Sequence, residues 1–323
     1  SRHAHVPPDP ARGRAYSTMQ KLTCAASAFV AKKLGFCDER RIEKGNSSSM
    51  PRTFIKLAEG IVFYGVLAIL LCFFLFLFVW MIMSSFKTVV QITAYPPQWI
   101  FTPTFQNYID VFTKNSFFEY LKNSTIIAVV AVAIGLLFGL PAAYSLARFK
   151  QAGVGFVILL VRILPGIVFL VPLFIIYRRL GLINTYTGII ATHIIIVLPT
   201  IIWIMAGFFE DVPRELEDAA MIDGCSRMSA FFRIILPLSR PGIVAVVILS
   251  FIASWNNFIF VLILGGNRTA TLPLAVYSFM SFEDVNWGGL NAAATLITLP
   301  ILLLSLLVQK QLARGLTMGA VKG

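Results

Sequence analysis

Charged side chains are scarce in this sequence. Of its 323 residues, only 13% are charged and 58% are hydrophobic, and the mean hydropathy is +0.81. Soluble globular domains carry about 25% charged residues. The shortage of charge therefore excludes an ordinary soluble domain and indicates a chain that lies mostly inside a lipid bilayer.

Groups that bind metals or phosphates are also missing. The four cysteines show no CxxC spacing and no neighbouring histidine, so the sequence indicates neither a zinc site nor a disulfide framework. His3 and His5 lie in a polar tail, far along the chain from His193, so no metal cluster follows from local spacing. There is no GxxxxGK[ST] phosphate loop and no Gly-Lys pair. We therefore expect this chain to hold no metal and no cofactor, and to bind no nucleotide through a phosphate loop.

Six apolar runs approach or exceed the ~20 residues that span a hydrocarbon core about 30 Å thick. They lie at about 60–84, 123–147, 154–177, 188–209, 241–264 and 289–309. The run from Ile61 to Met83 has no charge and no alternation of polar residues, which favours helices over barrel strands. We expect an all-α membrane protein with six transmembrane helices. Prolines interrupt several of these runs and predict kinks, at Pro141, Pro165, Pro172, Pro199 and Pro300.

The distribution of basic residues predicts the orientation. With the N-terminus in the cytoplasm, the inner segments hold 20 Lys and Arg residues and the outer segments hold 6. Both termini are therefore expected on the cytoplasmic side of the membrane. The net charge of +12 reflects this bias and attraction to anionic lipid heads, so the bilayer is the expected partner and nucleic acid is not.

Residues 1–49 differ from the rest because they are polar and basic and lack a long apolar run. We expect a poorly ordered extension there, apart from a short amphipathic helix around Met19 to Leu34. Residues 50–323 are expected to form the transmembrane domain.

One polar segment stands out, between the fourth and fifth runs. Residues 210–240 contain six acidic residues and four arginines. Pro213 and the acids that follow it predict a helix start, and Gly224 predicts a left-handed C-terminal cap. Ser226 can then cap a second helix that Pro237 ends.

These two short helices would present Ala219 and Ala220 as a small, smooth face for another protein. The residues alone also allow a merely solvated loop. The pattern Asp218-Ala219-Ala220-x3-Gly224-x9-Ile234-x-Leu236-Pro237 resembles the EAA loop of ABC importer permeases, with Asp where that family usually has Glu. The resemblance runs from about Phe54 to Gly323. Trp255-Asn256-Asn257 and the ending from Arg314 to Gly323 are similar to the carbohydrate-uptake branch, and most of all to its maltose-type second permease.

The resemblance implies a type I ABC importer permease fold, a place in a bacterial inner membrane, and a sugar or related polyol or sugar derivative as cargo. It also implies four partners: a second homologous permease, two ATP-binding subunits that bind ATP and Mg, and an extracytoplasmic solute-binding protein. By the same resemblance the chain catalyses nothing itself, and one set of residues is expected to couple it to the ATPase: Glu217, Asp218, Ala219, Ala220, Asp223, Gly224, Ile234, Leu236 and Pro237.

A second set of residues is expected along the substrate path: Arg162, Ser254, Trp255, Asn256, Asn257 and Asn291. Arg162 is the one charge placed inside a run, where it lines the path, pairs across the permease interface or snorkels to the cytoplasmic edge. The Ser-Trp-Asn-Asn group offers a ring platform and amides for a sugar, or else hydrogen bonds between helices. His193, among isoleucines, is expected to be packed and hydrogen-bonded.

The sequence fits two other classes of membrane protein less well. A self-sufficient secondary transporter or channel would want paired carboxylates inside the membrane or an inverted repeat, yet no Asp or Glu lies within the six runs. A membrane-embedded enzyme would need a nucleophile and base, or a metal cluster, within reach of each other. The sequence favours the importer permease over both.

Overall fold

The computed structural model describes residues 52–320, apart from 115, 150, 278 and 281–284. The extension 1–49, with its expected short helix, lies outside the described residues. Within them the chain is helical, and the only extended pairing is an isolated bridge between Met280 and Val285. The helices are α2 (Arg52–Ser85), α3 (Val89–Thr93), α4 (Gln106–Lys114), α5 (Phe117–Phe149), α6 (Ala152–Ile163), η1 (Gly166–Phe169), α7 (Leu170–Leu180), α8 (Tyr186–Glu210), α9 (Arg214–Ile222), α10 (Arg227–Ala230), η2 (Phe231–Ile235), α11 (Leu236–Leu238), α12 (Arg240–Trp255), α13 (Ile259–Leu264), α14 (Leu272–Tyr277) and α15 (Trp287–Ala320).

Membrane spans follow from helix length and composition. Among the described residues, α2, α5, α8 and α15 are long and apolar enough to cross a bilayer, and two bent helix pairs raise the number to six. The all-α class and a count of up to six spans therefore agree with the sequence prediction. Pro141, Pro199 and Pro300 lie inside the continuous helices α5, α8 and α15.

The prediction of a single helix at 154–177 is wrong, although the interruption predicted at Pro165 is confirmed. The chain forms α6 and α7, which are bent by 95° across a break that begins at Leu164. Leu164 is extended, with ψ 132°, because the ring of Pro165 disfavours the helical conformation in the residue before it. Pro172 falls in the first turn of α7, where its missing N–H leaves no helical bond unmade.

The expected helix at 241–264 is also wrong. Helix α12 ends at Trp255, and the chain becomes helical again only at Ile259, the start of α13. Asn256 and Asn257 fill the break, and short amide side chains compete with helical hydrogen bonds. The second bent span pairs α12 with the segment before it, Arg227–Leu238, at 78°.

The chain divides into two compact units, one up to Ala68 and one from Ile69. The described part of the first unit is the N-terminal portion of α2, whose side chains from Ile61 to Ala68 are exposed. In the second unit, the α2 side chains from Ile69 to Val79 are exposed as well. An apolar helix of this kind needs lipid or another protein around it.

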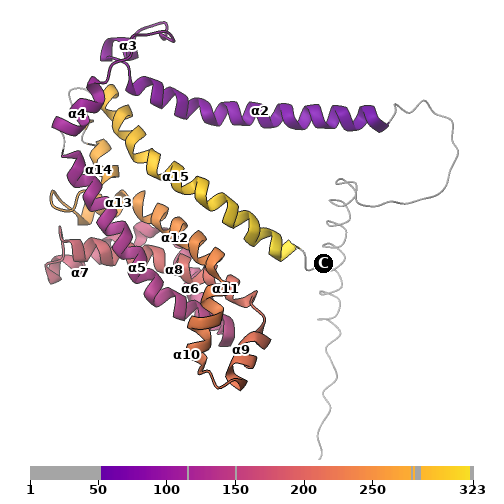
Figure 1. Ribbon diagram of the computed structural model, residues 1–323. Coiled ribbons are helices and arrows are strands. Elements are labelled where there is room, and N and C mark those ends of the chain that lie inside the picture. The colour runs from indigo at the N-terminus through magenta and orange to yellow at the C-terminus, as the bar shows by residue number, and fades with distance from the viewer. Residues whose placement is uncertain (1–51, 115, 150, 278, 281–284, 321–323) are drawn as a thin grey trace, which may run out of the picture. The chain divides into compact units, whose positions relative to one another are not determined.

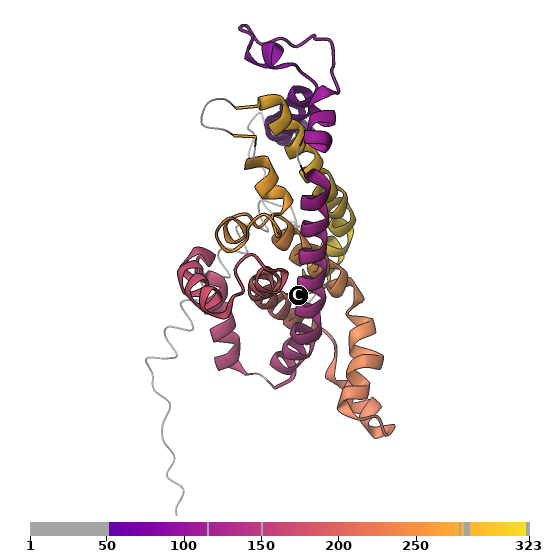
Figure 2. The same cartoon turned by 90° about the vertical axis from the view of Figure 1, so that its left-hand side faces the viewer.

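Helices α5 and α8 form the centre of the second unit, and α12 packs against both of them (Figures 1 and 2). Gly135 and Gly139 allow the close approach, because a Cβ added at Gly139 would lie 2.7 Å from Cγ2 of Ile201. Small residues serve the same purpose in membrane helix pairs generally. Helix α15 packs against α12 and α4.

Lys87 makes several contacts within the loop between α2 and α4. This loop lies at the end of the second unit where α5 begins. Its ammonium donates to the Gln98 carbonyl at 2.6 Å and lies 4.9 Å from the ring centres of both Trp80 and Phe101. The side-chain amide of Asn107 donates to the carbonyls of Ser85 and Lys87, each at 2.8 Å. Burial lowers the pKa of Lys87. The contacts of Lys87 and Asn107 together hold the loop in one conformation.

Candidate functional site

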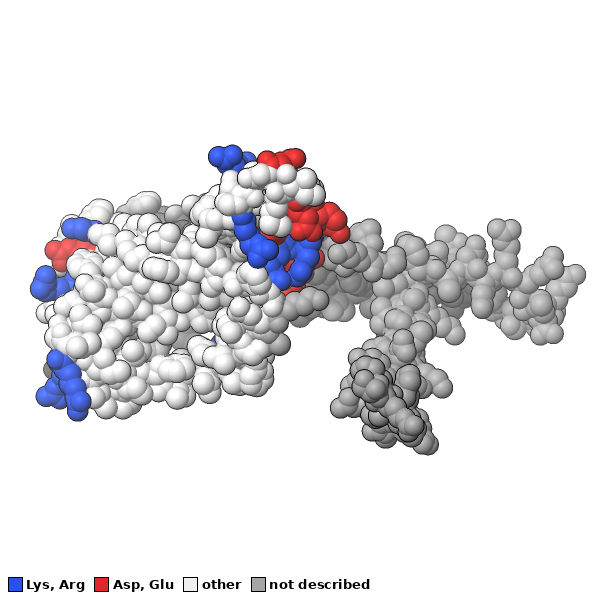
Figure 3. Space-filling model, turned by 90° about the horizontal axis from the view of Figure 1, so that it is seen from below, with Lys and Arg blue, Asp and Glu red and all other residues white. Residues whose placement is uncertain are grey.

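The polar segment between α8 and α12 forms a helical protrusion, called here the knob (residues 211–239). It extends beyond the ends of α5 and α8, as the lower part of Figures 1 and 2 shows. Figure 3 shows charged residues gathered on it and again at the opposite end, with an uncharged face between them. That pattern is expected when an apolar middle lies in lipid and both ends meet water.

The turn inside the knob has the predicted chemistry. Helix α9 begins directly after Pro213 and ends in a left-handed cap at Gly224, which has φ +86°. Cys225 N–H donates to the Ala220 carbonyl at 2.9 Å and Gly224 N–H to the Met221 carbonyl at 3.1 Å, which are the two bonds of a Schellman motif. The predicted cap is confirmed.

The second helix of the knob starts as expected and ends later. Ser226 Oγ accepts from Ser229 N–H at 3.2 Å and caps α10. The helix then widens into the π turn η2 and continues through Pro237 to Leu238, so the prediction that Pro237 ends it is wrong. In a π turn each N–H reaches one residue further back, and this altered ladder accommodates a residue that has no N–H.

The two alanines expected to share a surface lie on different sides of α9. Ala219 is exposed, whereas Ala220 is only 6% exposed because it faces the interior of the knob. Consecutive residues of a helix point about 100° apart, and the packing of α9 covers the side of Ala220 while it leaves that of Ala219 open. The shared alanine face is therefore a wrong prediction, and Ala219 alone is accessible.

Other residues of the expected coupling set also divide by exposure. Asp218, Asp223 and Gly224 are exposed, and Ile234, Leu236 and Pro237 are partly buried. Exposed apolar side chains accompany them on the knob: Leu216, Ile222, Met228 and Phe232. Such a group on a protrusion that water reaches is typical of a surface that binds another protein.

Glu217 is the exception, because it points into the protein. It is 5% exposed, and its Oε2 lies 2.8 Å from Nε of Arg148, near the end of α5. The hydroxyl of Tyr144, one turn earlier on α5, donates a hydrogen bond to Oε1. Arg227 of α10 approaches the same oxygen at 3.9 Å. Glu217 is therefore an internal anchor between α9 and α5, and it is not available on the docking face.

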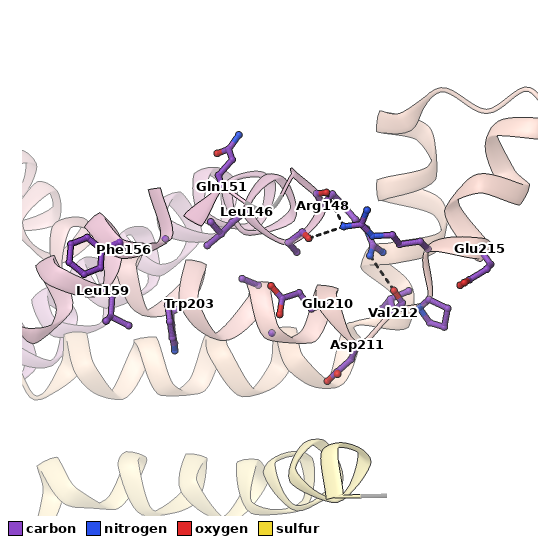
Figure 4. A pocket seen from close by; sticks show the side chains of 16 residues that line it. Leu146, Arg148, Gln151, Phe156, Leu159, Trp203, Glu210, Asp211, Val212 and Glu215 are labelled. Carbon is purple, nitrogen blue, oxygen red and sulfur yellow. Dashed lines mark hydrogen bonds between the residues drawn. The ribbon is translucent and has the colours of Figure 1, made fainter. Parts of the chain in front are cut away.

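Two arginines also donate hydrogen bonds between α5 and the start of the knob, one from each segment to backbone carbonyls of the other. Arg148 of α5 donates to the Val212 carbonyl, just before α9, at 3.2 Å. Arg214 of α9 donates to the carbonyls of Ala147 and Arg148 at 3.5 and 3.0 Å, so it caps the end of α5. Figure 4 shows these hydrogen bonds as dashed lines. The sequence prediction missed Tyr144 and Arg148, because neither belongs to a local pattern.

A groove of about 1110 Å³ lies beside this junction, between α5, α6, α8 and the first residues of α9 (Figure 4). Phe156, Leu159 and Trp203 make its apolar wall, and Glu210 and Asp211 lie at its polar end. Among the described residues, no group of three or more His, Cys, Asp or Glu could hold a metal ion.

The residues expected along a substrate path are not brought together. Ser254 and Trp255 are buried: Ser254 Oγ lies 2.7 Å from Nδ1 of His193, and the Trp255 indole donates to the Ile297 carbonyl at 3.4 Å. These are hydrogen bonds between helices, the second of the two roles considered above. The buried, hydrogen-bonded state predicted for His193 is confirmed.

The remaining path candidates lie apart. Asn256 is exposed in the break after α12, and Asn257 is partly buried there. The Asn291 amide donates to the Trp287 carbonyl of its own helix at 2.7 Å. Arg162 is exposed and lines a cavity of about 210 Å³ with residues of α7 and α8. In the described part of the chain this cavity does not include residues 254–257.

A membrane protein with a broken third span and a polar knob between two spans is the class that this fold and site define. The family model described as binding-protein-dependent transport system inner membrane component matches residues 135–318. That match covers more than half of the chain. The chain belongs to this family of inner membrane transport components.

Individual relatives agree with the family. The probable ABC transporter permease protein y4oR of Sinorhizobium fredii is 37% identical over 278 residues, covering 85% of this chain and 99% of the relative. The sulfoquinovosyl glycerol transport system permease protein SmoH of Agrobacterium fabrum is 34% identical, with coverage of 79% and 92%. The trehalose/maltose transport system permease protein MalG of Thermococcus litoralis is 34% identical, with coverage of 80% and 95%.

Among solved structures, a chain of a bacterial ABC transporter involved in the import of the acidic polysaccharide alginate has the same fold. Its TM-score is 0.67 at 21% identity, and the match covers 82% of this chain and 99% of that one. At this identity the likeness concerns the fold alone.

Proposed function

We propose that this chain is the permease subunit of an ATP-driven importer that moves a sugar, a polyol or a sugar derivative across the inner membrane. Two of the three relatives described above support the cargo class, since one is named for sulfoquinovosyl glycerol and the other for trehalose and maltose. The observation that carries the mechanism is the knob: a compact, capped protrusion with exposed Asp218, Ala219 and Ile222 on an otherwise apolar chain.

In this proposal the knob docks on a separate ATP-hydrolysing subunit, and ATP and Mg are bound there. The complete machine has this chain, a second permease of similar fold, two ATPase subunits and an extracytoplasmic binding protein. The knob and both termini lie in the cytoplasm, in keeping with the excess of Lys and Arg on that side. The chain transmits work and catalyses no reaction itself.

Cross-linking tests the docking. A cysteine at Ala219, which is exposed, is expected to cross-link to the nucleotide-binding subunit in the intact assembly. The matched control is a cysteine at Ala220, which is buried and is expected to react little. Failure of the Ala219 cysteine to reach that subunit under any nucleotide condition would rule out the docking role.

The cargo is best identified by measuring which ligand the extracytoplasmic binding protein binds. Isothermal titration of the neighbouring extracytoplasmic binding protein with mono- and disaccharides, polyols and sulfonated sugars is expected to find a ligand among them. Tight binding of an amino acid or an inorganic ion instead would overturn the proposed cargo class and leave the docking role untouched.

A further inference from the structure

The buried cluster of Tyr144, Arg148 and Glu217 does more than fold the knob. We propose that it delivers the knob's movement to α5, and that α5 carries this movement to the opposite end of the protein. The proposal rests on the proposed docking of the knob on an ATPase. In it the three side chains are positioning residues, because none of them touches cargo or nucleotide.

The chain connections alone do not link the knob to α5. The knob is joined covalently to α8 on one side and to α12 on the other, and Glu217 lies 73 residues from Tyr144 along the chain. A displacement of the knob would therefore reach α5 only through noncovalent contacts. The cluster is the ion-paired contact between α9 and α5, and the side chains of Arg148 and Glu217 are almost wholly buried, at 6% and 7% exposure.

Burial makes this contact stiff. An ion pair withdrawn from water interacts more strongly than an exposed one, and separating its partners leaves an unpaired charge in an apolar place. The cross-bonding of Arg148 to the Val212 carbonyl and of Arg214 to the end of α5 adds hydrogen bonds in both directions. A displacement of the knob relative to α5 would therefore have to break these hydrogen bonds as well as the ion pair.

Aromatic packing completes the junction. The Tyr144 ring lies 4.8 Å from that of Phe231 in η2 and 6.2 Å from that of Phe209 near the end of α8. The three rings belong to one buried cluster with Ile201 and Met205 of α8. The end of α5, the end of α8 and the second half of the knob thus pack as one body.

Helix α5 is built to carry a displacement along its length. Its 33 residues correspond to about 50 Å at 1.5 Å per residue. Near its other end, the Asn123 amide donates to the Ala270 and Arg268 carbonyls at 2.8 and 3.1 Å, and Leu272 N–H donates to Ser124 Oγ at 2.8 Å. The loop before α14 is therefore held by the same helix that holds the knob.

A distance measurement tests this in the assembled transporter. Spin labels go on Arg233 of the knob and Leu137 of α5, both exposed. In the wild type this distance is expected to stay within about 2 Å when a non-hydrolysable ATP analogue with Mg is added, as for a rigid-body motion. In Glu217→Gln, which keeps the shape but removes the charge, the analogue is expected to shift the distance by more than about 2 Å or to broaden it.

Two controls accompany the measurement. Glu119→Gln makes the same chemical change at an exposed position of α5 and is expected to behave as the wild type. If Glu217→Gln fails to assemble, the pair Arg148→Met and Glu217→Met replaces it, because removing both charges leaves no unpaired buried charge. In the double variant, adding the analogue is expected to shift or broaden the distance between the two spin labels, as in Glu217→Gln.

The outcomes separate this inference from the proposed function. An unchanged distance in Glu217→Gln or in the double variant, equal to the wild type with and without nucleotide, would overturn the role of the cluster. A wild-type distance that itself shifts by more than about 2 Å when the analogue is added would also overturn that role. Absence of the Ala219 cross-link in the wild type would instead overturn the docking on which the inference rests.

Discussion

Gly224 determines the shape of the knob through its backbone. Its φ of +86° lies in the left-handed region, and a Cβ added there would meet open space. A side chain at this position would therefore act through backbone strain and would not collide with a neighbour. β-Branched residues are the least tolerant of this conformation, and Asn is among the more tolerant.

We expect Gly224→Val to uncouple transport from ATP hydrolysis, because strain of about 1–3 kcal/mol would open the cap and change the docking surface. Uptake of the binding protein's ligand should fall while ATP hydrolysis continues, and both are measured in proteoliposomes. Gly224→Asn, the matched control, should stay close to the wild type. Normal uptake by Gly224→Val would count heavily against a docking role for the knob.

Gly139 acts through contact instead. Its added Cβ would lie 2.7 Å from Cγ2 of Ile201, so α5 and α8 would have to separate. We expect Gly139→Ala to lower stability by about 1–3 kcal/mol, as overpacking does, measured as a lower melting temperature of the purified protein. Gly153→Ala on α6, where nothing lies within 4 Å, should not destabilise. Equal melting temperatures for the two variants would contradict the close packing.

At the level of elements, the broken spans matter most. The 95° bend between α6 and α7 and the interruption after α12 both place non-helical backbone in segments that were expected to span the membrane. Such backbone is tolerated at membrane depth where protein or a water-filled cavity surrounds it. The breaks therefore favour a protein that encloses a path, in keeping with the permease role proposed here.

Helix α5 contrasts with these broken spans. It runs unbroken through Pro141, packs against α8 along its glycines and joins the knob to the loop before α14. An unbroken helix transmits displacement, whereas a broken one absorbs it. The two kinds of element suit the two tasks of an importer subunit, which are to convey movement and to open and close a path.

At the level of the whole molecule, the chain depends on partners. The apolar exposed length of α2 needs lipid or protein around it, and the knob is proposed to dock on an ATPase subunit. We expect the purified chain, reconstituted alone in liposomes, to hydrolyse no ATP and to take up no sugar, since it has no phosphate-binding loop. A radiolabelled uptake assay measures this, and robust uptake would favour a self-sufficient secondary transporter.

The sequence by itself determined the features that depend on neighbours along the chain. Apolar runs located four of the six expected spans as continuous helices, because the thickness of a bilayer sets their length. The proline and glycine around α9 located the start and the cap of that helix, because both residues act through local backbone geometry. The position and outline of the knob followed from these signals.

Only the tertiary structure decided which way the side chains of the knob face. That Glu217 and Ala220 turn inward, while Asp218 and Ala219 turn outward, depends on where α5 and η2 pack against α9. The residues that hold Glu217 lie about 70 positions earlier, and helical periodicity relates only residues within a few turns of each other. Contacts between distant segments arise from packing, and no local pattern encodes them.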